Sequence, residues 1–347
     1  MKVLLVITGR GLGGDAVIAI NVIKALEEKG VECEIALDKT APGILFKKNN
    51  YDWHKITIPQ AGGHAASKKT AIKAAFRSLS AVFKLRSLVK KVNPDLVVGI
   101  NGGGAVVGAI GAKLARTPSF SLICTPLDSK VCPRLNNCLA FPELFNCYEF
   151  PENVSKTYFP INPNTNKGDK TKAFEKLKQE KNFDENKKTI LFSSGSSIFK
   201  GVMEGVNNFS NVTDEYNVVL VGLPLKEEYM DIIDQDKVIY LGYIDWLKDL
   251  YDYVDLVIAT DDGLMIEESL ACQCPTVSLT KVKWGRYHNF ASIFEGAVIE
   301  AEVDNLNEKI FEALDNLDEL KNNAKKYSKE ILDANSLIAN TIINELD

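Results

Sequence analysis

Short runs of apolar, often β-branched residues alternate along the chain with longer segments whose apolar residues recur at helical spacing. Such runs are typical of strands buried on both faces of a parallel sheet. The predicted strands are Val3–Ile7, Glu34–Leu37, Asp95–Ile100, Ser119–Ile123, Thr189–Phe192, Asn217–Val221, Lys237–Leu241, Asp255–Ala259 and Thr276–Leu279. The predicted helices are Ala16–Glu28, Lys69–Val92, Ala105–Ala115, Gly201–Phe209, Lys226–Ile233, Leu264–Cys272 and Tyr287–Glu295. Because strand and helix alternate, the pattern predicts an α/β protein.

The alternation stops once, between about residue 151 and residue 188, where prolines, asparagines and a lysine-rich polar stretch show no strand pattern. It then starts afresh and ends in a polar helical segment at the C-terminus. We therefore predict two doubly wound, Rossmann-like domains that face each other across a cleft. The predicted bounds are 1–158 for an N-terminal domain, 159–188 for a linker, 189–330 for a C-terminal domain and 331–347 for a terminal helix that could pack back on the N-terminal domain.

Composition agrees with two globular domains and adds an uneven distribution of charge. The chain has 347 residues, of which 46% are hydrophobic, and a net charge of −5. Residues 1–150 carry 20 Lys and Arg against 11 Asp and Glu, whereas the remainder has a net charge of −14. No apolar run approaches the roughly 18 residues that span a bilayer, and the first residues resemble a strand rather than a signal peptide. A basic half joined to an acidic half indicates different partners for the two halves.

Two glycine-rich turns follow predicted strands in the first half. The first strand runs into the sequence Gly9–Asp15, and Asp95–Ile100 runs into Asn101-Gly102-Gly103-Gly104. Glycines allow tight turns whose N–H groups point at a ligand, and ligands of α/β sheets bind where strands end. Asp15 is interpreted either as a helix cap or as a carboxylate that takes a proton. The spacing fails the dinucleotide fingerprint, and Asp38 is a weak candidate for its acidic residue.

Two comparable turns follow strands in the second half. The run Ser193–Ser197 comes after Thr189–Phe192, and Thr260–Gly263 precedes a helix that carries Glu267 and Glu268. Hydroxyl and N–H groups suit a phosphate, and a glutamate near a helix start can accept hydrogen bonds from a ribose diol.

The order of these motifs resembles the bacterial MurG family, GT-B glycosyltransferases that move N-acetylglucosamine from UDP-N-acetylglucosamine to a lipid-linked cell-wall precursor. Leu12-Gly13-Gly14-Asp15 stands where the family has T-G-G-H. Further matching segments are Ile58–Gly104, Asn162-Pro163, Gly195-Ser196, Tyr243-Ile244-Asp245, Glu268 with Ala271, Pro275, and Tyr287-x-Asn289. The resemblance covers nearly the whole chain and implies an inverting transferase that requires no cofactor or metal.

The resemblance also implies roles for particular residues. Asp15 takes the place of the family's histidine and is expected to act as general base. The expected acceptor and pyrophosphate site comprises Gly13, Gly14, His64, Gly102, Gly103 and Gly104. The expected donor site comprises Gly195, Ser196, Ser197, Tyr243, Ile244, Gly263, Leu264, Met265, Glu268, Arg286 and Asn289. A solvated loop histidine is the alternative interpretation of His64.

Several positions depart from the family pattern. Met265 replaces a phosphate-contacting threonine, Thr165 an arginine, and Gly285-Arg286 two sugar-reading glutamines, while Cys124–Asp128 replaces the segment H-E-Q-N. A guanidinium at 286 can hold a carboxylate of an N-acetylated uronic acid, or it can hold the diphosphate in place of the missing arginine.

A basic amphipathic stretch precedes the second glycine turn, and no acidic residue occurs from Trp53 to Pro94. It either packs on the core with a solvated charged face or lies against anionic lipid. The resemblance favours the membrane, and few stacking aromatics argue against nucleic acid. The residues expected to face the membrane are Lys68, Lys69, Lys73, Phe76, Arg77, Leu79 and Phe83.

Seven cysteines occur without the spacing of a secreted disulfide framework, which favours a reducing cytoplasm. Cys124, Cys132, Cys138 and Cys147 match no standard zinc or iron-sulfur spacing, so buried thiols are favoured over a metal site.

The resemblance to the MurG family implies a peripheral membrane enzyme of surface-glycan or cell-wall synthesis at the cytoplasmic face. It is expected to transfer N-acetylglucosamine, or a related N-acetylhexosamine or uronic acid, from a UDP-sugar to a polyprenyl-pyrophosphate-linked acceptor. The alternatives are a UDP-N-acetylglucosamine 2-epimerase and a non-catalytic GT-B-like binding module with a cysteine-ligated metal or cluster.

Overall fold

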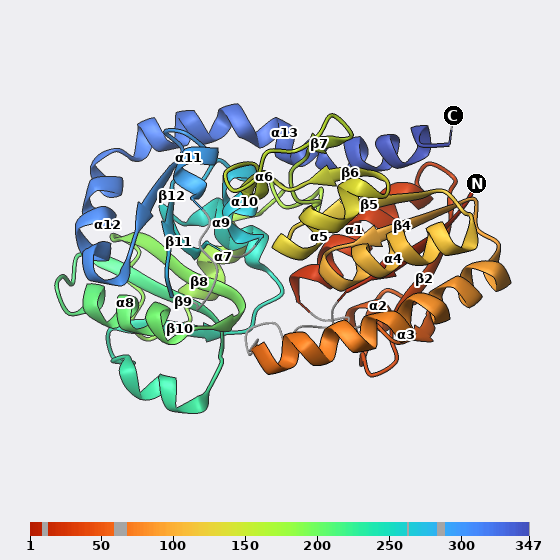
Figure 1. The fold of residues 1–347 in the computed structure, drawn as a ribbon. Helices are drawn as coiled ribbons and strands as arrows, with labels where there is room; N and C mark the ends of the chain where they lie inside the picture. Colours follow the sequence, from red (N-terminus) through yellow and green to blue (C-terminus); the bar gives the residue numbers. More distant parts are fainter. Residues whose placement is uncertain (9–12, 59–67, 262–263, 283–288, 347) are drawn as a thin grey trace. The chain divides into compact units, whose positions relative to one another are not determined.

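The chain folds into two α/β units, each built around one fully parallel sheet (Figure 1). The computed structural model describes residues 1–8, 13–58, 68–261, 264–282 and 289–346, and the side chains of 68–78 lie outside this description. The first unit comprises Met1–Pro160 and Asp333–Asp347, and the second comprises Ile161–Leu332. Two Rossmann-like domains are therefore confirmed.

Seven strands form the sheet of the first unit, in the order β3-β2-β1-β4-β5-β6-β7. Their bounds are β1 Lys2–Ile7, β2 Glu32–Asp38, β3 His54–Ile56, β4 Leu96–Ile100, β5 Ser119–Ile123, β6 Asn137–Ala140 and β7 Val154–Lys156. The order reverses between β1 and β4, and the register pairs Val3 with Leu96 and Lys2 with Glu32. In such sheets this switch point, at the carboxyl ends of the strands, is where ligands bind.

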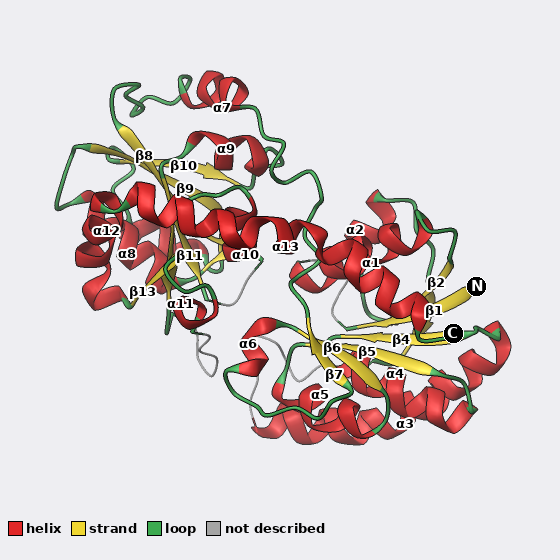
Figure 2. Ribbon diagram, turned by 90° about the horizontal axis from the view of Figure 1, so that it is seen from above, coloured by secondary structure: helices red, strands yellow, loops and turns green. Residues whose placement is uncertain are grey.

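Helices cover both faces of this sheet. Their bounds are α1 Gly14–Glu27, α2 Ile44–Lys48, α3 Lys68–Val92, α4 Gly102–Ala115, α5 Pro126–Val131 and α6 Pro142–Phe145, with a 3₁₀ turn at Cys132–Arg134. Figure 2 shows α1 on one face and α3 beside α4 on the other. The buried residues Val82 and Leu85 of α3 pack with Leu4, Val6 and Val97 of the sheet. Burial of this kind is the dominant favourable term for the unit.

Six strands form the sheet of the second unit, in the order β10-β9-β8-β11-β12-β13, which repeats the topology of the first. Their bounds are β8 Lys188–Ile198, β9 Tyr216–Pro224, β10 Val238–Gly242, β11 Leu256–Thr260, β12 Thr276–Leu279 and β13 Val298–Ala301. The helices are α7 Lys170–Leu177, α8 Lys200–Ser210, α9 Leu247–Tyr253, α10 Met265–Ala271, α11 Phe290–Ile293, α12 Leu306–Asp315 and α13 Leu317–Asn344. Two further 3₁₀ turns span Glu227–Ile232 and Val303–Asn305.

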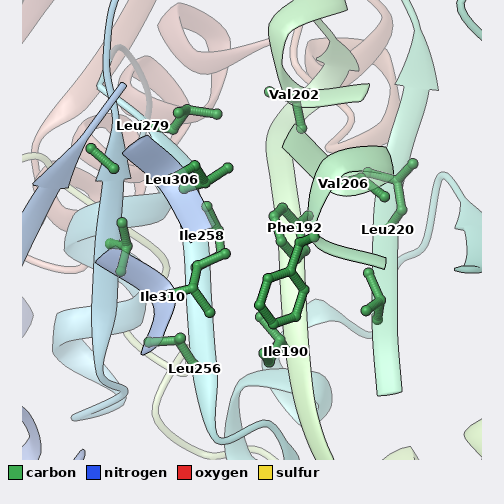
Figure 3. Close-up of a cluster of buried hydrophobic side chains, with 14 of the residues drawn as sticks. Ile190, Phe192, Val202, Val206, Leu220, Leu256, Ile258, Leu279, Leu306 and Ile310 are labelled. Atoms are coloured by element: carbon green, nitrogen blue, oxygen red, sulfur yellow. The ribbon is translucent and has the colours of Figure 1, made fainter. Parts of the chain in front are cut away.

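The core of the second unit lies between its sheet and the helices α8 and α12. Figure 3 shows Phe192 of β8 and Ile258 of β11 in this cluster, with Val206 of α8 and Ile310 of α12. The side chain of Phe192 is fully buried. Apolar residues at helical spacing on α8 and α12 therefore face the apolar sheet, as the sequence pattern predicts.

The structure differs from the predicted elements at several places. Residues 159–188, predicted as a linker, contain α7, and Ile161 onward belongs to the second unit. The predicted helix Lys226–Ile233 is a 3₁₀ turn over Glu227–Ile232, and β7 lies in the stretch predicted to lack strands. The terminal helix α13 is shared, because the division of the chain assigns residues from Asp333 onward to the first unit.

Candidate active site

The start of α1 lies at the switch point of the first unit, directly after β1. Gly13 is the N-cap residue and has φ 82°, a conformation that side chains disfavour and glycine adopts freely. Its carbonyl accepts hydrogen bonds from the N–H groups of Ala16 and Val17. No atom of the described residues comes within 4 Å of a Cβ built at Gly14.

Asp15 lies inside the first turn of α1 and does not cap it. The alternative interpretation of Asp15 as a helix cap is therefore wrong, because Gly13 holds that position. The Nδ2 group of Asn101 donates a hydrogen bond of 2.9 Å to Oδ1 of Asp15. Among the described residues, Oδ2 of Asp15 accepts no hydrogen bond. A half-buried carboxylate with one free oxygen at a helix N-terminus can accept a proton from a bound hydroxyl.

Asn101 connects β4 with α4 in an unusual conformation. Its backbone has φ 54° and ψ 141°, a region that residues with a side chain rarely adopt. The residue is only 1% exposed, and its Oδ1 atom has no hydrogen-bond partner among the described residues. Backbone strain of this kind and an unpaired buried acceptor each cost about 1–3 kcal/mol. Sequence reasoning noticed Asn101 in the glycine turn but did not include it among the site residues.

The glycines after Asn101 serve packing more than ligand binding. The N–H of Gly102 donates to Oδ2 of Asp128 at 2.5 Å, and the N–H of Gly104 donates to Oγ1 of Thr8 at 2.7 Å. A Cβ at Gly104 would come within 2.5 Å of the backbone nitrogen of Thr8. Of the three predicted glycines, Gly103 keeps an N–H with no acceptor among the described residues. The N–H groups of Gly102 and Gly104 are thus bonded within the protein, and the predicted ligand role of these glycines stays a prediction.

Asp128 joins the ends of β4 and β5. Its buried carboxylate accepts hydrogen bonds from the N–H groups of Gly102, Cys124 and Thr125 and from the hydroxyl of Thr125. Burial raises the pKa of Asp128, although these hydrogen bonds act in the opposite direction. The residue therefore has a structural role: it fixes the start of α4 and forms a capping box with Thr125 at the start of α5.

The carboxylate of Asp38, the weak candidate for a ribose-binding acid, is hydrogen-bonded to other residues of the protein. It accepts hydrogen bonds from the N–H and hydroxyl of Thr40 and from the N–H of Ile58. Burial acts to raise the pKa of Asp38, but the hydrogen bonds outweigh it and hold the pKa below its usual value.

In the second unit the serine-rich run is an irregularity within β8 rather than a loop after it. The register between β8 and β9 shifts between Ser193 and Ser197, and Gly195 has φ 82° with open space around it. The buried hydroxyl of Ser193 donates to the carbonyl of Val221 and accepts the N–H of Gly195. Ser196 is exposed, and its hydroxyl has no partner among the described residues. The bulge therefore presents Ser196 to solvent.

Glu268 lies on α10, after the carboxyl end of β11. The hydroxyl of Tyr251 donates to Oε2 of Glu268 at 3.1 Å. Burial raises the pKa of Glu268, and the bond from Tyr251 partly opposes the rise. Leu264 is half-buried before the helix, whereas Met265 is buried inside the unit. Tyr251 is a residue that sequence reasoning missed.

The remaining donor-site residues lie on other segments of the second unit. Tyr243 is 63% exposed after β10, and Ile244 beside it is half-buried. Asn289 caps α11, since its Oδ1 accepts the N–H of Ser292. His64, Gly263 and Arg286 lie outside the described residues.

Comparisons with known proteins match both units to sugar transferases. The model of the glycosyltransferase family 28 N-terminal domain matches residues 5–121, and the model of glycosyl transferases group 1 matches residues 173–331. The chain is a MurG-like glycosyltransferase.

One relative is the UDP-N-acetylglucosamine--N-acetylmuramyl-(pentapeptide) pyrophosphoryl-undecaprenol N-acetylglucosamine transferase of Clostridium novyi (strain NT). It is 26% identical over 99% of this chain and 97% of its own length. The crystal structure of Acinetobacter baumannii MurG is 18% identical with a TM-score of 0.69 over 99% of each chain. A candidate UDP-N-acetylglucosamine 2-epimerase from Listeria monocytogenes shares the fold with 13% identity and a TM-score of 0.65, over 99% of this chain and 94% of that one. The fold alone therefore does not separate the two activities.

Helix α3 of this MurG-like chain presents apolar side chains on two sides. Ala81, Val82, Leu85, Leu88 and Val89 are buried. Leu79 and Phe83, one helical turn apart, are 64% and 59% exposed, and Lys84, Lys90 and Lys91 of the same helix are exposed as well. The side chains of Lys68, Lys69, Lys73, Phe76 and Arg77 lie outside the described residues. Core packing accounts for the inner face, and Leu79 and Phe83 lie outside the buried set of this helix.

The cysteines of the MurG-like chain show no metal site in the described parts of the structure. No group of three or more His, Cys, Asp or Glu side chains is placed to hold a metal ion there. Cys132 and Cys138 are buried, Cys124 is half-buried and Cys147 is exposed. Burial raises the pKa of the Cys132 thiol to about 12, so this thiol stays protonated at neutral pH. In the described segments of the chain, no helix is long and apolar enough to cross a membrane.

Proposed function

We propose that the chain transfers N-acetylglucosamine, or a related N-acetylhexosamine or uronic acid, from a UDP-sugar to a polyprenyl-pyrophosphate-linked acceptor. The proposal combines the named activity of the relatives with one observation in this chain. That observation is the carboxylate of Asp15 at the switch point of the first unit, with Oδ1 held by Asn101 and Oδ2 without a partner among the described residues.

Asp15 serves as general base in this proposal. Its Oδ2 atom takes the proton of an acceptor hydroxyl, whose oxygen then attacks the anomeric carbon of the donor. The bond from that carbon to the UDP oxygen breaks, and the UDP leaves with the electron pair, so the configuration inverts. A positioned general base contributes typically about 10²–10⁴ in rate.

The second unit contributes the donor site. Exposed Ser196 in the bulge of β8 offers a hydroxyl to the diphosphate, and the serine N–H groups beside it suit the same anion. Glu268, oriented by Tyr251, accepts from the ribose hydroxyls, and the segment Tyr243–Ile244 lies against the uracil. Arg286 holds either the diphosphate or the carboxylate of a uronic-acid donor.

The test is a transfer assay with UDP-N-acetylglucosamine and a polyprenyl-pyrophosphate-linked sugar. We expect transfer by the wild type, loss of at least about a hundredfold in Asp15→Asn, and unchanged UDP binding in that variant by calorimetry. Retained activity in Asp15→Asn would remove its role as base. Release of UDP-N-acetylmannosamine without acceptor would instead identify an epimerase.

The exposed apolar pair on α3 supports attachment to the cytoplasmic face of an anionic membrane. Leu79 and Phe83 would enter the headgroup region while the neighbouring lysines meet anionic lipid, at about 1 kcal/mol for each basic residue near the surface.

Sedimentation with phosphatidylglycerol vesicles tests the attachment. We expect salt-sensitive binding that falls about tenfold or more in the double variant Leu79→Ser with Phe83→Ser. Val212→Ser is the matched control, because Val212 is 59% exposed on the second unit. Equal binding of the double variant and the control contradicts the membrane role of this pair.

A further inference from the structure

The pair formed by Asp15 and Asn101 brings together two turns that are 86 residues apart in the sequence. We propose that Asn101 is a positioning residue that fixes the carboxylate of Asp15 so that Oδ2 faces the acceptor hydroxyl. This inference rests on the proposed function, in which Asp15 is the base.

The chemistry of the contact fixes the orientation of both side chains. A carboxylate can only accept, so the Asn101 group at 2.9 Å from Oδ1 of Asp15 is the amide nitrogen and not the oxygen. The hydrogen bond occupies one carboxylate oxygen and leaves the other for a proton.

The backbone conformation and the burial of Asn101 both disfavour a polar side chain at this position. Its φ of 54° would be unstrained in glycine, and the residue after it is a glycine with φ 44°. The Oδ1 atom is buried without a partner among the described residues. Since both features are unfavourable, they are offset by the hydrogen bond to Asp15, which is the one hydrogen bond that this side chain makes among the described residues.

The start of α4 does not depend on this amide. The N–H groups of Gly102 and Gly104 are fixed by Asp128 and Thr8, and the close approach of Gly104 to β1 holds the helix against the sheet. Removal of the Asn101 side chain therefore leaves the turn anchored and releases the carboxylate. A displaced base lowers the rate of the chemical step more than it lowers substrate affinity.

The experiment measures kcat and KM for the wild type, Asn101→Gly and Asn101→Asp. In Asn101→Gly we expect kcat to fall about tenfold to a hundredfold while KM for the UDP-sugar changes less than about twofold. In Asn101→Asp, which replaces the donor with a second carboxylate beside Asp15, we expect kcat to fall at least as far, again with little change in KM.

Asn93→Gly is the matched control, because Asn93 is an exposed asparagine with φ 49° in the same unit. Unchanged kcat in Asn101→Gly would overturn the positioning role in an enzyme that still transfers sugar. Absence of transfer by the wild type overturns the proposed function itself, and the catalytic role of the pair with it. A lower melting temperature in Asn101→Gly, with kcat and KM for the UDP-sugar impaired to the same extent, would show that Asn101 is structural only.

Discussion

The two units share one strand order, yet their turns at the carboxyl ends of the central strands are built differently. In the first unit the ends of β1, β4 and β5 are joined by hydrogen bonds that Thr8, Asp128 and Asn101 make across the turns. In the second unit the buried hydroxyl of Ser193 stabilises the bulge of β8 through a hydrogen bond to the neighbouring strand, and Ser196 remains exposed. The turns of the first unit are bonded to one another through backbone N–H groups, whereas the bulge of the second unit leaves Ser196 exposed to solvent.

The same contrast holds for carboxylates. Asp38 in the first unit accepts three hydrogen bonds, which hold its pKa below the usual value. Glu268 in the second unit accepts one hydrogen bond among the described residues, from Tyr251, and burial raises its pKa. A carboxylate surrounded by donors serves the fold, whereas one with spare acceptor capacity can serve a ligand. Asp15 belongs with the second kind although it lies in the first unit.

The largest expected effect concerns the glycines of the first unit. Gly104→Ala should lower the stability of the unit by about 3 kcal/mol or more, because a Cβ there would come within 2.5 Å of the nitrogen of Thr8 and 2.6 Å of the carbonyl oxygen of Val6. Calorimetry of the full chain should show a melting temperature lower by about 10 °C in the transition of this unit.

Gly14→Ala is the control for this prediction. Gly14 lies in the first turn of α1, and in the described part of the chain no atom lies within 4 Å of the added Cβ, so the change should be neutral or slightly stabilising, within about 1 kcal/mol. Equal destabilisation by both substitutions would show that close packing does not distinguish these glycines.

The sequence pattern predicted the central strands and the α/β class. Long apolar runs and helical spacing result from the burial of a single strand or helix, so they can be seen in its own residues. It missed β3, β6, β7 and β13, edge or near-edge strands whose few residues include polar ones such as His54 and Glu300. Strands this short carry too little periodicity to be distinguished from loops. Their pairing depends on neighbouring strands that the local pattern does not contain.

The candidate site shows the same limit at the level of single residues. Asp15 could be proposed from its place after a glycine turn, but its partner Asn101 is set by the alignment of β1 with β4. Likewise, the sequence of Asn101–Gly104 does not show that Gly104 packs against β1 while Gly103 keeps a free N–H. Which of these glycines packs closely depends on the strand that lies beside the turn in the fold.

The second prediction separates the two serines of the β8 bulge. Ser193→Ala removes a buried hydroxyl that joins Val221 to Gly195, so it should lower the stability of the second unit by about 2 kcal/mol. Ser196→Ala should leave the melting temperature unchanged and weaken UDP binding by about tenfold in calorimetry. If Ser196→Ala binds UDP as the wild type does, the bulge is not the diphosphate site.

The smallest effect tests the two carboxylates through pH. The pKa of Asp38 is lower in the folded chain than its unfolded value of about 3.9, so its contribution to stability is present above that value and is lost as pH falls through the folded pKa. Asp38→Asn should therefore lower stability by about 1 kcal/mol at pH 7, because Ile58 loses a charged acceptor, and the deficit should shrink toward pH 3. Thermal melts of the full chain at several pH values measure both effects.

Two comparison variants sharpen this result. Asp52→Asn changes an exposed carboxylate that accepts no hydrogen bond among the described residues, so it should show no deficit at any pH. Glu268→Gln should not lower the melting temperature at pH 7, since the raised pKa of Glu268 means that its ionised form is disfavoured in the folded chain. Two results would contradict the distinction between a carboxylate that supports the fold and one available to a ligand. One is a loss of stability in Asp38→Asn that does not change with pH. The other is a loss of stability at pH 7 in Glu268→Gln as large as that in Asp38→Asn.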